Sequence, residues 1–139
     1  MQLNNKSEIE TKAKELLLQL GITPDLSGYK CATTAITELL YSKQRVSHCK
    51  LYLSQKKSVS TCNLYQKCAD ELQMSRSAFE RAIRYTIISR FKDKNKLEHF
   101  EDVIRCKVDK LNVSSFLSLC VERLFINEEE SKVINILEL

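Results

Sequence analysis

Polar side chains recur at three- and four-residue steps through the segment SRSAFERAIRY, positions 75–85. At about 3.6 residues per helical turn, four of them, Ser77, Glu80, Arg81 and Arg84, fall within about 100° of arc on one side of a helix. An arginine on such a face can bind guanine through two hydrogen bonds or contact phosphate, and a glutamate can accept a hydrogen bond from the amino group of cytosine. The spacing therefore predicts a helix face that contacts DNA bases through Ser77, Glu80, Arg81 and Arg84.

These residues also have a second interpretation, in which the helix face is only solvated. Ser77 and Glu80 have the spacing of a capping box, in which Glu80 would bind a backbone N–H at the start of the helix and contact no base. Tyr85 follows Arg84 and is included in the expected groove face. We predict contact with DNA at these positions and keep capping as the alternative for Glu80.

Apolar residues on the opposite side of this helix predict how it is held. In a helix-turn-helix the first helix needs a small residue where the two helices cross, and Ala69 is suited to that place. Gln73 occupies a turn position where many such motifs have glycine, and Ser75 or Ser77 can cap the second helix. The expected buried stripe consists of Phe79, Ala82, Ile83, Thr86 and Ile87. The segment 64–91 is therefore predicted to be a helix-turn-helix.

Two basic segments lie near this motif in the chain. One runs from Lys43 to Lys57 without an acidic residue, and the other runs from Arg90 to Lys96 with only Asp93 in opposition. If both segments flank the recognition helix they contact phosphates and make affinity fall with salt; otherwise they are ordinary solubilising lysines. The net charge of +4 alone does not require a nucleic-acid partner. The expected phosphate contacts are Arg76, Lys56, Lys57, Lys92 and Lys94.

Six cysteines are enough for a metal site, but no C-x-x-C pair occurs, and zinc ligands usually come in such pairs. Cys49 adjoins His48, and with Cys62 it keeps a metal-binding or redox-sensing loop as a minor alternative. Unpaired thiols are typical of the reducing cytosol. Four cysteines have apolar neighbours on expected helices and are interpreted as small core residues. These are Cys31, Cys68, Cys106 and Cys120.

No catalytic arrangement is recognisable in the sequence. His48 and His99 stand alone, and there is no nucleophile elbow, phosphate loop or supported pair of carboxylates. We therefore expect no enzyme activity, no cofactor and no metal. The N-terminal segment lacks the apolar core of a signal peptide, and no stretch approaches the roughly 20 apolar residues of a membrane span. A cytoplasmic protein without membrane contact is expected.

The composition predicts an all-α fold, because only two glycines and one proline are present and apolar residues recur mostly at helical spacing. A chain of 139 residues fits one domain, expected here as a compact bundle of about six helices over residues 1–139. Ser7 and Glu10 form the expected capping box of the first helix, and Gly21 suits its stop. The expected elements are helices at 7–20, 28–41 and 112–125, the helix-turn-helix at 64–91 and a tail at 126–139.

The remaining segments are less regular. The segment 42–63 is expected to contain a short helix and a loop, the polar run KDKNK at 92–96 is expected to be a connector, and 97–104 a short helix. Asn112 or Ser114 can cap the last helix. The apolar end of the tail, VINILEL, either completes the core, which we favour, or docks on a second protomer.

Four stretches, LLLQLGI, GYK, SRSAFERAIR and FLSLCVERL, occur in an order that carries a resemblance to a known family. From about Ile9 to Leu124 the chain resembles the C-terminal effector domain of stage zero sporulation protein A, the DNA-binding half of a bacterial sporulation response regulator. The resemblance is most specific at Gly28, Tyr29 and the ERAIR segment at 80–84. It implies a helical bundle around a helix-turn-helix, which binds tandem promoter boxes as a head-to-tail dimer.

The resemblance also assigns individual positions. The residues that match family recognition-helix positions are Ser77, Glu80, Arg81 and Arg84. Two positions differ, because Ala78 stands where the family usually has an arginine that contacts bases, and Tyr85 where it usually has a histidine. Loss of one arginine–guanine contact typically costs about 1–3 kcal/mol of discrimination at one base pair. An altered or relaxed DNA box is therefore expected.

The family's regulator has an N-terminal phosphoacceptor domain, whereas this sequence begins at the effector helices. We therefore expect a stand-alone effector domain, constitutively active or controlled by a partner, a ligand or its own concentration. The predicted function is sequence-specific regulation of transcription, with double-stranded DNA as partner and a homodimer on tandem sites. The alternative is a protein-protein interaction module of the same fold that has lost DNA binding and modulates another regulator. A redox- or metal-dependent regulator is a weaker third hypothesis.

Overall fold

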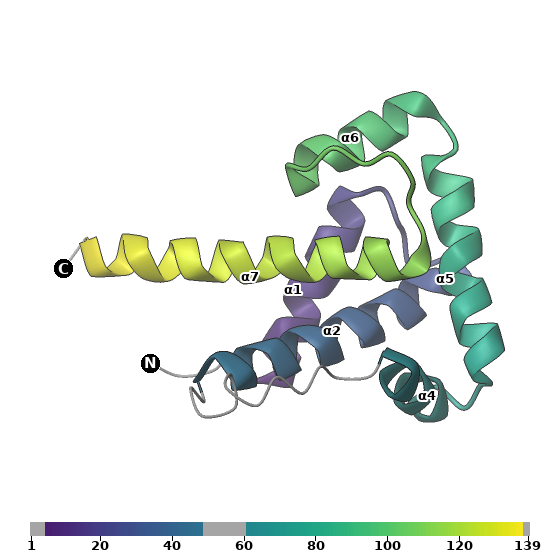
Figure 1. The fold of residues 1–139 in the computed structure, drawn as a ribbon, viewed down its shortest axis with the longest axis horizontal. Helices are drawn as coiled ribbons and strands as arrows, with labels where there is room; N and C mark the ends of the chain where they lie inside the picture. The colour runs from purple at the N-terminus through teal and green to yellow at the C-terminus, as the bar shows by residue number, and fades with distance from the viewer. Residues whose placement is uncertain (1–4, 49–60, 138–139) are drawn as a thin grey trace.

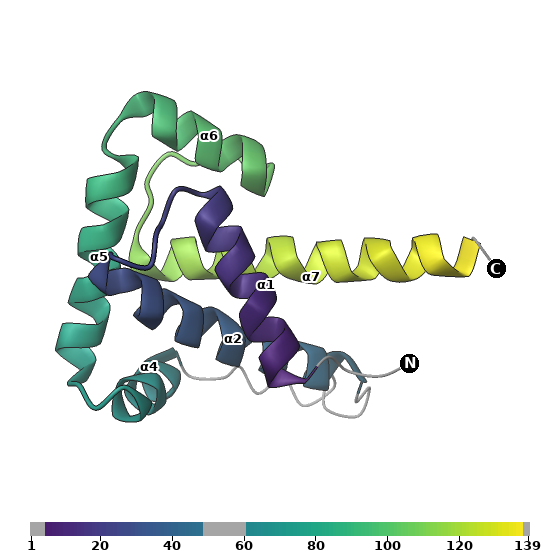
Figure 2. The ribbon, with the colours of Figure 1, turned by 180° about the vertical axis from the view of Figure 1, so that it is seen from behind.

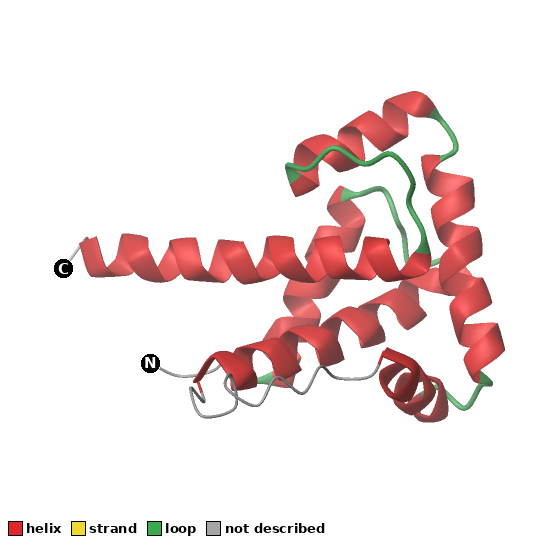
Figure 3. Ribbon diagram, in the orientation of Figure 1, coloured by secondary structure: helices red, strands yellow, loops and turns green. Residues whose placement is uncertain are grey.

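The computed structural model describes the backbone of residues 5–48 and 61–137, and the side chains of residues 5–43 and 63–130. Every regular element in these ranges is an α-helix, which confirms the predicted all-α class (Figure 3). The helices are α1 (Lys6–Gln19), α2 (Ser27–His48), α4 (Thr61–Glu71), α5 (Arg76–Phe91), α6 (Lys94–Ile104) and α7 (Val113–Leu137).

The helix α2 lies in the middle of the bundle and contacts α1, α4, α5 and α7. In the two opposite views, α1 crosses α2, α7 runs beside it, and α5 stands across their ends at one edge of the molecule (Figures 1 and 2). The helices α4 and α6 adjoin the start and the end of α5 (Figure 1). This arrangement gives α5 an inner side that faces the bundle and an outer side that faces away from it.

The predicted apolar stripes form much of the core. Phe91 at the end of α5 packs against Phe100 of α6 and Phe116 of α7, with ring centroids 5.0 and 6.1 Å away. This aromatic cluster fixes the C-terminal end of α5. On α1 the buried residues are Ile9, Ala13, Leu16 and Leu17. On the inner side of α5 they are Phe79, Ile83, Thr86, Ile87 and Phe91.

The turn between α4 and α5 adopts a left-handed conformation without glycine. Gln73 has a φ of 57°, and its N–H donates to the carbonyl of Asp70 at 3.1 Å. The N–H of Met74 donates to the carbonyl of Ala69 at 3.0 Å, which completes a Schellman motif. The position predicted from the sequence to suit glycine is therefore in the conformation that glycine favours. Gly21, with a φ of 85°, ends α1 as predicted.

Two helix starts differ from the predictions. Asn5, not Ser7, caps α1, because its Oδ1 accepts a hydrogen bond from the N–H of Glu8 at 2.9 Å. The connector predicted at 92–96 was wrong, since Asp93 caps α6 and the next three residues are helical. Lysine is a good helix former whose exposed charge is compatible with a helix surface, so a polar run can begin a helix once a capping side chain precedes it.

Two other helices are longer than predicted. The helix α2 continues past the predicted 28–41 as far as His48, and the segment 49–60 lies outside the described residues. Asn112 is the cap of α7, because its Oδ1 accepts from the N–H of Ser115 at 2.8 Å. The predicted tail is helical as far as Leu137, and its last turns extend past the other helices (Figures 1 and 2). Its docking stays a prediction, because its apolar side chains lie outside the described residues.

Candidate nucleic-acid interface

The inner side of α5 is fixed to α2 by one close approach. Thr86 is buried, and its Oγ1 accepts a hydrogen bond from the N–H of Gly28 at 3.1 Å while donating to the carbonyl of Ala82 at 2.9 Å. The N–H of Gly28 belongs to the first turn of α2, where N–H groups have no partner within the helix. A Cβ atom at Gly28 would come within 2.6 Å of the Ala82 carbonyl. Only glycine therefore allows this approach, which positions α5 against the bundle.

The start of α5 is capped by Ser75. Its Oγ accepts a hydrogen bond from the N–H of Ala78 at 3.1 Å, so of the two predicted caps Ser75 is the one used. Ser77 lies within the first turn and is exposed. The capping box between Ser77 and Glu80, kept as an alternative, was therefore wrong. The carboxylate of Glu80 is not engaged by the start of the helix.

The outer side of α5 presents the residues predicted for base contact. Ser77, Arg81 and Arg84 are exposed, Tyr85 is 60% exposed, and Glu80 is half-buried. Among the side chains that the structure describes, none forms a hydrogen bond or an ion pair with Arg81 or Arg84. An unpaired guanidinium keeps five N–H donors in a planar fork. The outer side is therefore a set of donors held on a rigid helix and open to solvent.

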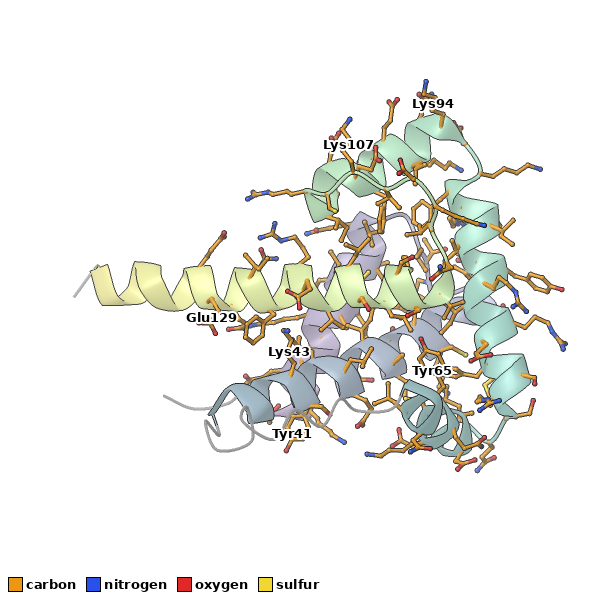
Figure 4. The ribbon with its side chains drawn as sticks, viewed as in Figure 1. Tyr41, Lys43, Tyr65, Lys94, Lys107 and Glu129 are labelled. Carbon is orange, nitrogen blue, oxygen red and sulfur yellow. The ribbon has the colours of Figure 1, made fainter. Side chains whose placement is uncertain are left out.

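The charge of this helix is strongly one-sided. Residues 76–92 contain five basic residues and one acidic residue, Glu80. Side chains of α5 project from the outer edge of the bundle (Figure 4). Glu80 and Arg84 lie one turn apart and both line a groove of about 470 Å³, whose other wall is the segment 111–114 and Tyr65 of α4. No ion pair joins Glu80 to Arg84, and Arg84 is exposed while Glu80 is half-buried.

Sequence reasoning missed one residue on this face. Ile88 is 54% exposed, although its type is typical of a core position. At about 100° per residue it lies about 20° from Ser77 around α5, between Arg84 and Arg81. The sequence did contain a signal for this exposure. Ile87 belongs to the buried stripe, and the next residue, about 100° further around the helix, is turned toward the outer side.

The predicted phosphate contacts lie at both ends of α5 where they are described. Arg76 is the first residue of α5, Lys92 follows its last residue, and Lys94 begins α6; all three are exposed (Figure 4 shows Lys94). The 16 residues of α5 span about 24 Å at 1.5 Å per residue. Lys56 and Lys57 lie outside the described residues.

The other basic segment begins away from α5. Lys43 pairs with Glu122 at 2.7 Å, and its Nζ lies 4.9 Å from the ring centroid of Phe125. Both partners belong to α7, and Figure 4 shows Lys43 between α2 and α7. Lys43 is also about four turns along α2 from Gly28, where α2 meets α5. This lysine therefore contacts α7, and the expectation that its segment flanks α5 does not hold at Lys43.

Three of the four cysteines assigned to the core are buried there. Cys31, Cys68 and Cys120 are at most 3% exposed, and burial raises the pKa of each thiol, that of Cys68 to about 12. The negative charge of Glu38 adds to the effect at Cys68. A thiol with a raised pKa is rarely a thiolate at neutral pH and is a poor nucleophile or metal ligand. These three residues therefore serve as small core side chains.

Cys106 was assigned to the core wrongly. It is exposed and follows Arg105, whose φ of 62° turns the chain at the end of α6. The side chains of Cys49 and Cys62 lie outside the described residues. Among the described residues, no group of three His, Cys, Asp or Glu side chains could hold a metal ion. None of the helices in the described ranges combines the length and apolar character that crossing a membrane requires.

The sequence matches the family model described as the C-terminal part of sporulation initiation factor Spo0A, over residues 13–124. The match includes the helix-turn-helix and ends within α7. It confirms the resemblance inferred from the four sequence stretches. The family is one of DNA-binding effector domains of sporulation regulators and not an enzyme family. No curated protein gives a significant match to the chain.

Proposed function

Because the chain belongs to the Spo0A C-terminal family of DNA-binding effector domains, we propose that it regulates transcription by binding a specific double-stranded sequence through the outer side of α5. Arg81 and Arg84 contact base edges in the major groove, which is wide enough to admit a helix. Ser77, Glu80 and Tyr85 complete the contact face. The main observation behind the proposal is that both arginines are exposed and unpaired with any described residue. They lie on a helix whose inner side is held to α2 by the hydrogen bond between Gly28 and Thr86.

Glu80 adds specificity to this face. Because Ser75 caps the helix, the Glu80 carboxylate is free to accept a hydrogen bond from the amino group of a cytosine. A carboxylate close to phosphates is unfavourable unless it finds such a donor, so it penalises sequences without a cytosine at that position. The arginines then supply affinity and base recognition, and Glu80 rejects wrong sequences.

Phosphate contacts at the two ends of α5 orient the helix in the groove. Arg76 lies at the start, and Lys92 and Lys94 lie at the end, so together they bracket the base-contacting residues. Each phosphate contact releases condensed counterions, with a slope of log K against log salt of about −0.9 per contact. Three contacts would contribute roughly −2.7 to that slope. Lys56 and Lys57 remain expected additional contacts.

The test begins with a duplex enriched from a random sequence pool by the protein itself. Fluorescence anisotropy then compares this duplex with a scrambled one at low and near-physiological salt. Replacing both arginines, Arg81→Gln with Arg84→Gln, should weaken binding to the enriched duplex by about 100-fold, since each bidentate contact contributes about 1–3 kcal/mol. The preference over the scrambled duplex should be largely lost.

A matched control separates base contact from net charge. Lys14→Gln with Lys107→Gln removes the same two charges from exposed positions on α1 and after α6, away from the outer side of α5. This control should change binding by less than threefold at near-physiological salt, where distant charges are screened. Equal weakening by both double variants would contradict base recognition by α5. Circular dichroism should show that all variants stay folded.

Two exposed large residues on the same face, Tyr85 and Ile88, support a second candidate function. Ala78 and Tyr85 stand where the family that the sequence resembles usually has an arginine and a histidine, which makes the outer side of α5 less polar than the resemblance implies. In this second function the outer side of α5 binds another regulatory protein and does not bind DNA. Failure to enrich any duplex, together with a stable stoichiometric complex with a protein partner, would favour this function.

A further inference from the structure

The outer side of α5 contains an apolar side chain among its polar ones. Ile88 is 54% exposed and lies one turn after Arg84. An isoleucine side chain left in water forgoes part of the favourable free energy of apolar burial. The other large hydrophobic residues exposed in the described part are Tyr85 on the same side of α5, which also carries a hydroxyl group, Leu18 on α1 and Ile126 on α7. Ile88 is thus set within the proposed contact face.

In the major groove one base carries a matching apolar group. Thymine presents a C5-methyl group there, and no other base pair presents an equivalent one. From the position and exposure of Ile88 we infer that this residue contacts a thymine methyl group and so determines sequence specificity at one base pair. The inference rests on the proposed function of α5 and extends it to a residue that forms no hydrogen bonds.

The helix geometry fixes where that thymine lies. Residues four apart are neighbours on a helix surface and differ by about 6 Å along the axis. Successive base pairs rise by about 3.4 Å. The thymine contacted by Ile88 therefore lies within about two base pairs of the base contacted by Arg84. A β-branched side chain has essentially one favoured χ1 rotamer in a helix, so Ile88 loses little freedom when it binds.

The experiment uses the enriched duplex, in which each thymine is replaced in turn by deoxyuridine. This replacement removes only the methyl group and leaves base pairing intact. The guanine that Arg84 contacts is the one whose preference Arg84→Gln abolishes. For the unmodified protein, deoxyuridine at one position within two base pairs of that guanine should weaken binding about fourfold, since a buried methyl group contributes about 0.8 kcal/mol. For Ile88→Ala, the same position should show no difference between thymine and deoxyuridine.

Leu18→Ala is the matched control, because Leu18 is exposed to a similar extent on α1. It should leave the deoxyuridine profile of the unmodified protein unchanged. A profile that stays the same in Ile88→Ala, with the preference over scrambled DNA intact, would overturn the inference and leave the proposed function standing. Loss of pairing between two protomers on tandem sites in Ile88→Ala, without a change in that profile, would also overturn it. If the unmodified protein prefers no sequence, both conclusions fail.

Discussion

A single buried hydroxyl determines how α5 meets the bundle. The Oγ1 of Thr86 accepts a hydrogen bond from α2 and donates one within α5. The arrangement satisfies an N–H group at the start of α2 that no residue of α2 can reach. It also requires that residue 28 have no side chain, since the hydroxyl and the Ala82 carbonyl occupy that space. The glycine in the GYK stretch is therefore explained by the placement of α5.

Thr86→Val tests this contact at constant shape. The valine fills the same volume but leaves the N–H of Gly28 buried without an acceptor, which should lower the free energy of unfolding by about 1–3 kcal/mol. Thr86→Ser keeps the hydroxyl and should cost less than about 1 kcal/mol, the value of one buried methyl group. Urea unfolding followed by circular dichroism measures both variants. A larger loss for serine than for valine would show that packing, and not the hydrogen bond, holds α5 in place.

Among the elements, the turn between α4 and α5 combines a favourable motif with an unfavourable residue. The Schellman hydrogen bonds of Gln73 and Met74 end α4 and set the angle at which α5 begins. A left-handed conformation costs a non-glycine residue roughly 1–2 kcal/mol. The backbone of Gln73 is therefore strained, although the hydrogen bonds of the Schellman motif are all formed.

Gln73→Gly should stabilise the protein by up to about 1 kcal/mol, because relief of the left-handed conformation exceeds the extra backbone entropy of glycine in the unfolded chain. Gly21→Ala provides the reverse change at the end of α1. Gly21 has a φ of 85° and no atom within 4 Å of an added Cβ, so only the backbone conformation opposes alanine. That variant should lose about 1 kcal/mol in the same thermal or urea unfolding measurement. Destabilisation by Gln73→Gly would mean that the glutamine side chain itself stabilises the turn.

Predictions from the sequence succeeded where periodicity was strong. Three- and four-residue spacing of apolar residues located α1 and α5, and the same spacing placed Arg81 and Arg84 on the outer side. Helix ends were harder, because Asn5 and Asp93 act as caps through single hydrogen bonds that competing polar residues could equally form. Ile88 was missed because residue type suggests burial, whereas the angle around α5 gives exposure.

At the scale of the whole molecule, α2 connects the helix-turn-helix to the rest of the bundle through Glu38. This carboxylate is buried and pairs with Lys6 of α1 at 2.7 Å and with Lys67 of α4 at 3.2 Å. Burial acts to raise the pKa of Glu38, but hydrogen bonds from Lys6 and Lys67 outweigh it and hold the pKa below its ordinary value of 4.5. The ionised form of Glu38 is therefore the one that joins three helices.

The acid sensitivity of the fold should depend on this residue. Because the pKa of Glu38 is lower in the folded state than in the unfolded chain, its stabilisation is complete above about pH 4.5 and is lost as the pH falls through the folded-state value. Glu38→Gln should lower the free energy of unfolding by about 1–2 kcal/mol at pH 7. The expected loss is kept small because Lys6 and Lys67 are half-exposed, so that solvent screens their attraction to the carboxylate.

The difference between Glu38→Gln and the unmodified protein should shrink as the pH is lowered from 6 to about 3, because protonation then removes the same charge from the unmodified protein. Urea unfolding at a series of pH values measures it. Glu10→Gln is the control, since Glu10 forms only an exposed pair with Lys14 at 3.7 Å, and it should change stability by at most a few tenths of a kcal/mol at any pH. A constant difference across this pH range would place the role of Glu38 in packing, since packing contributes equally whether or not the carboxylate is charged.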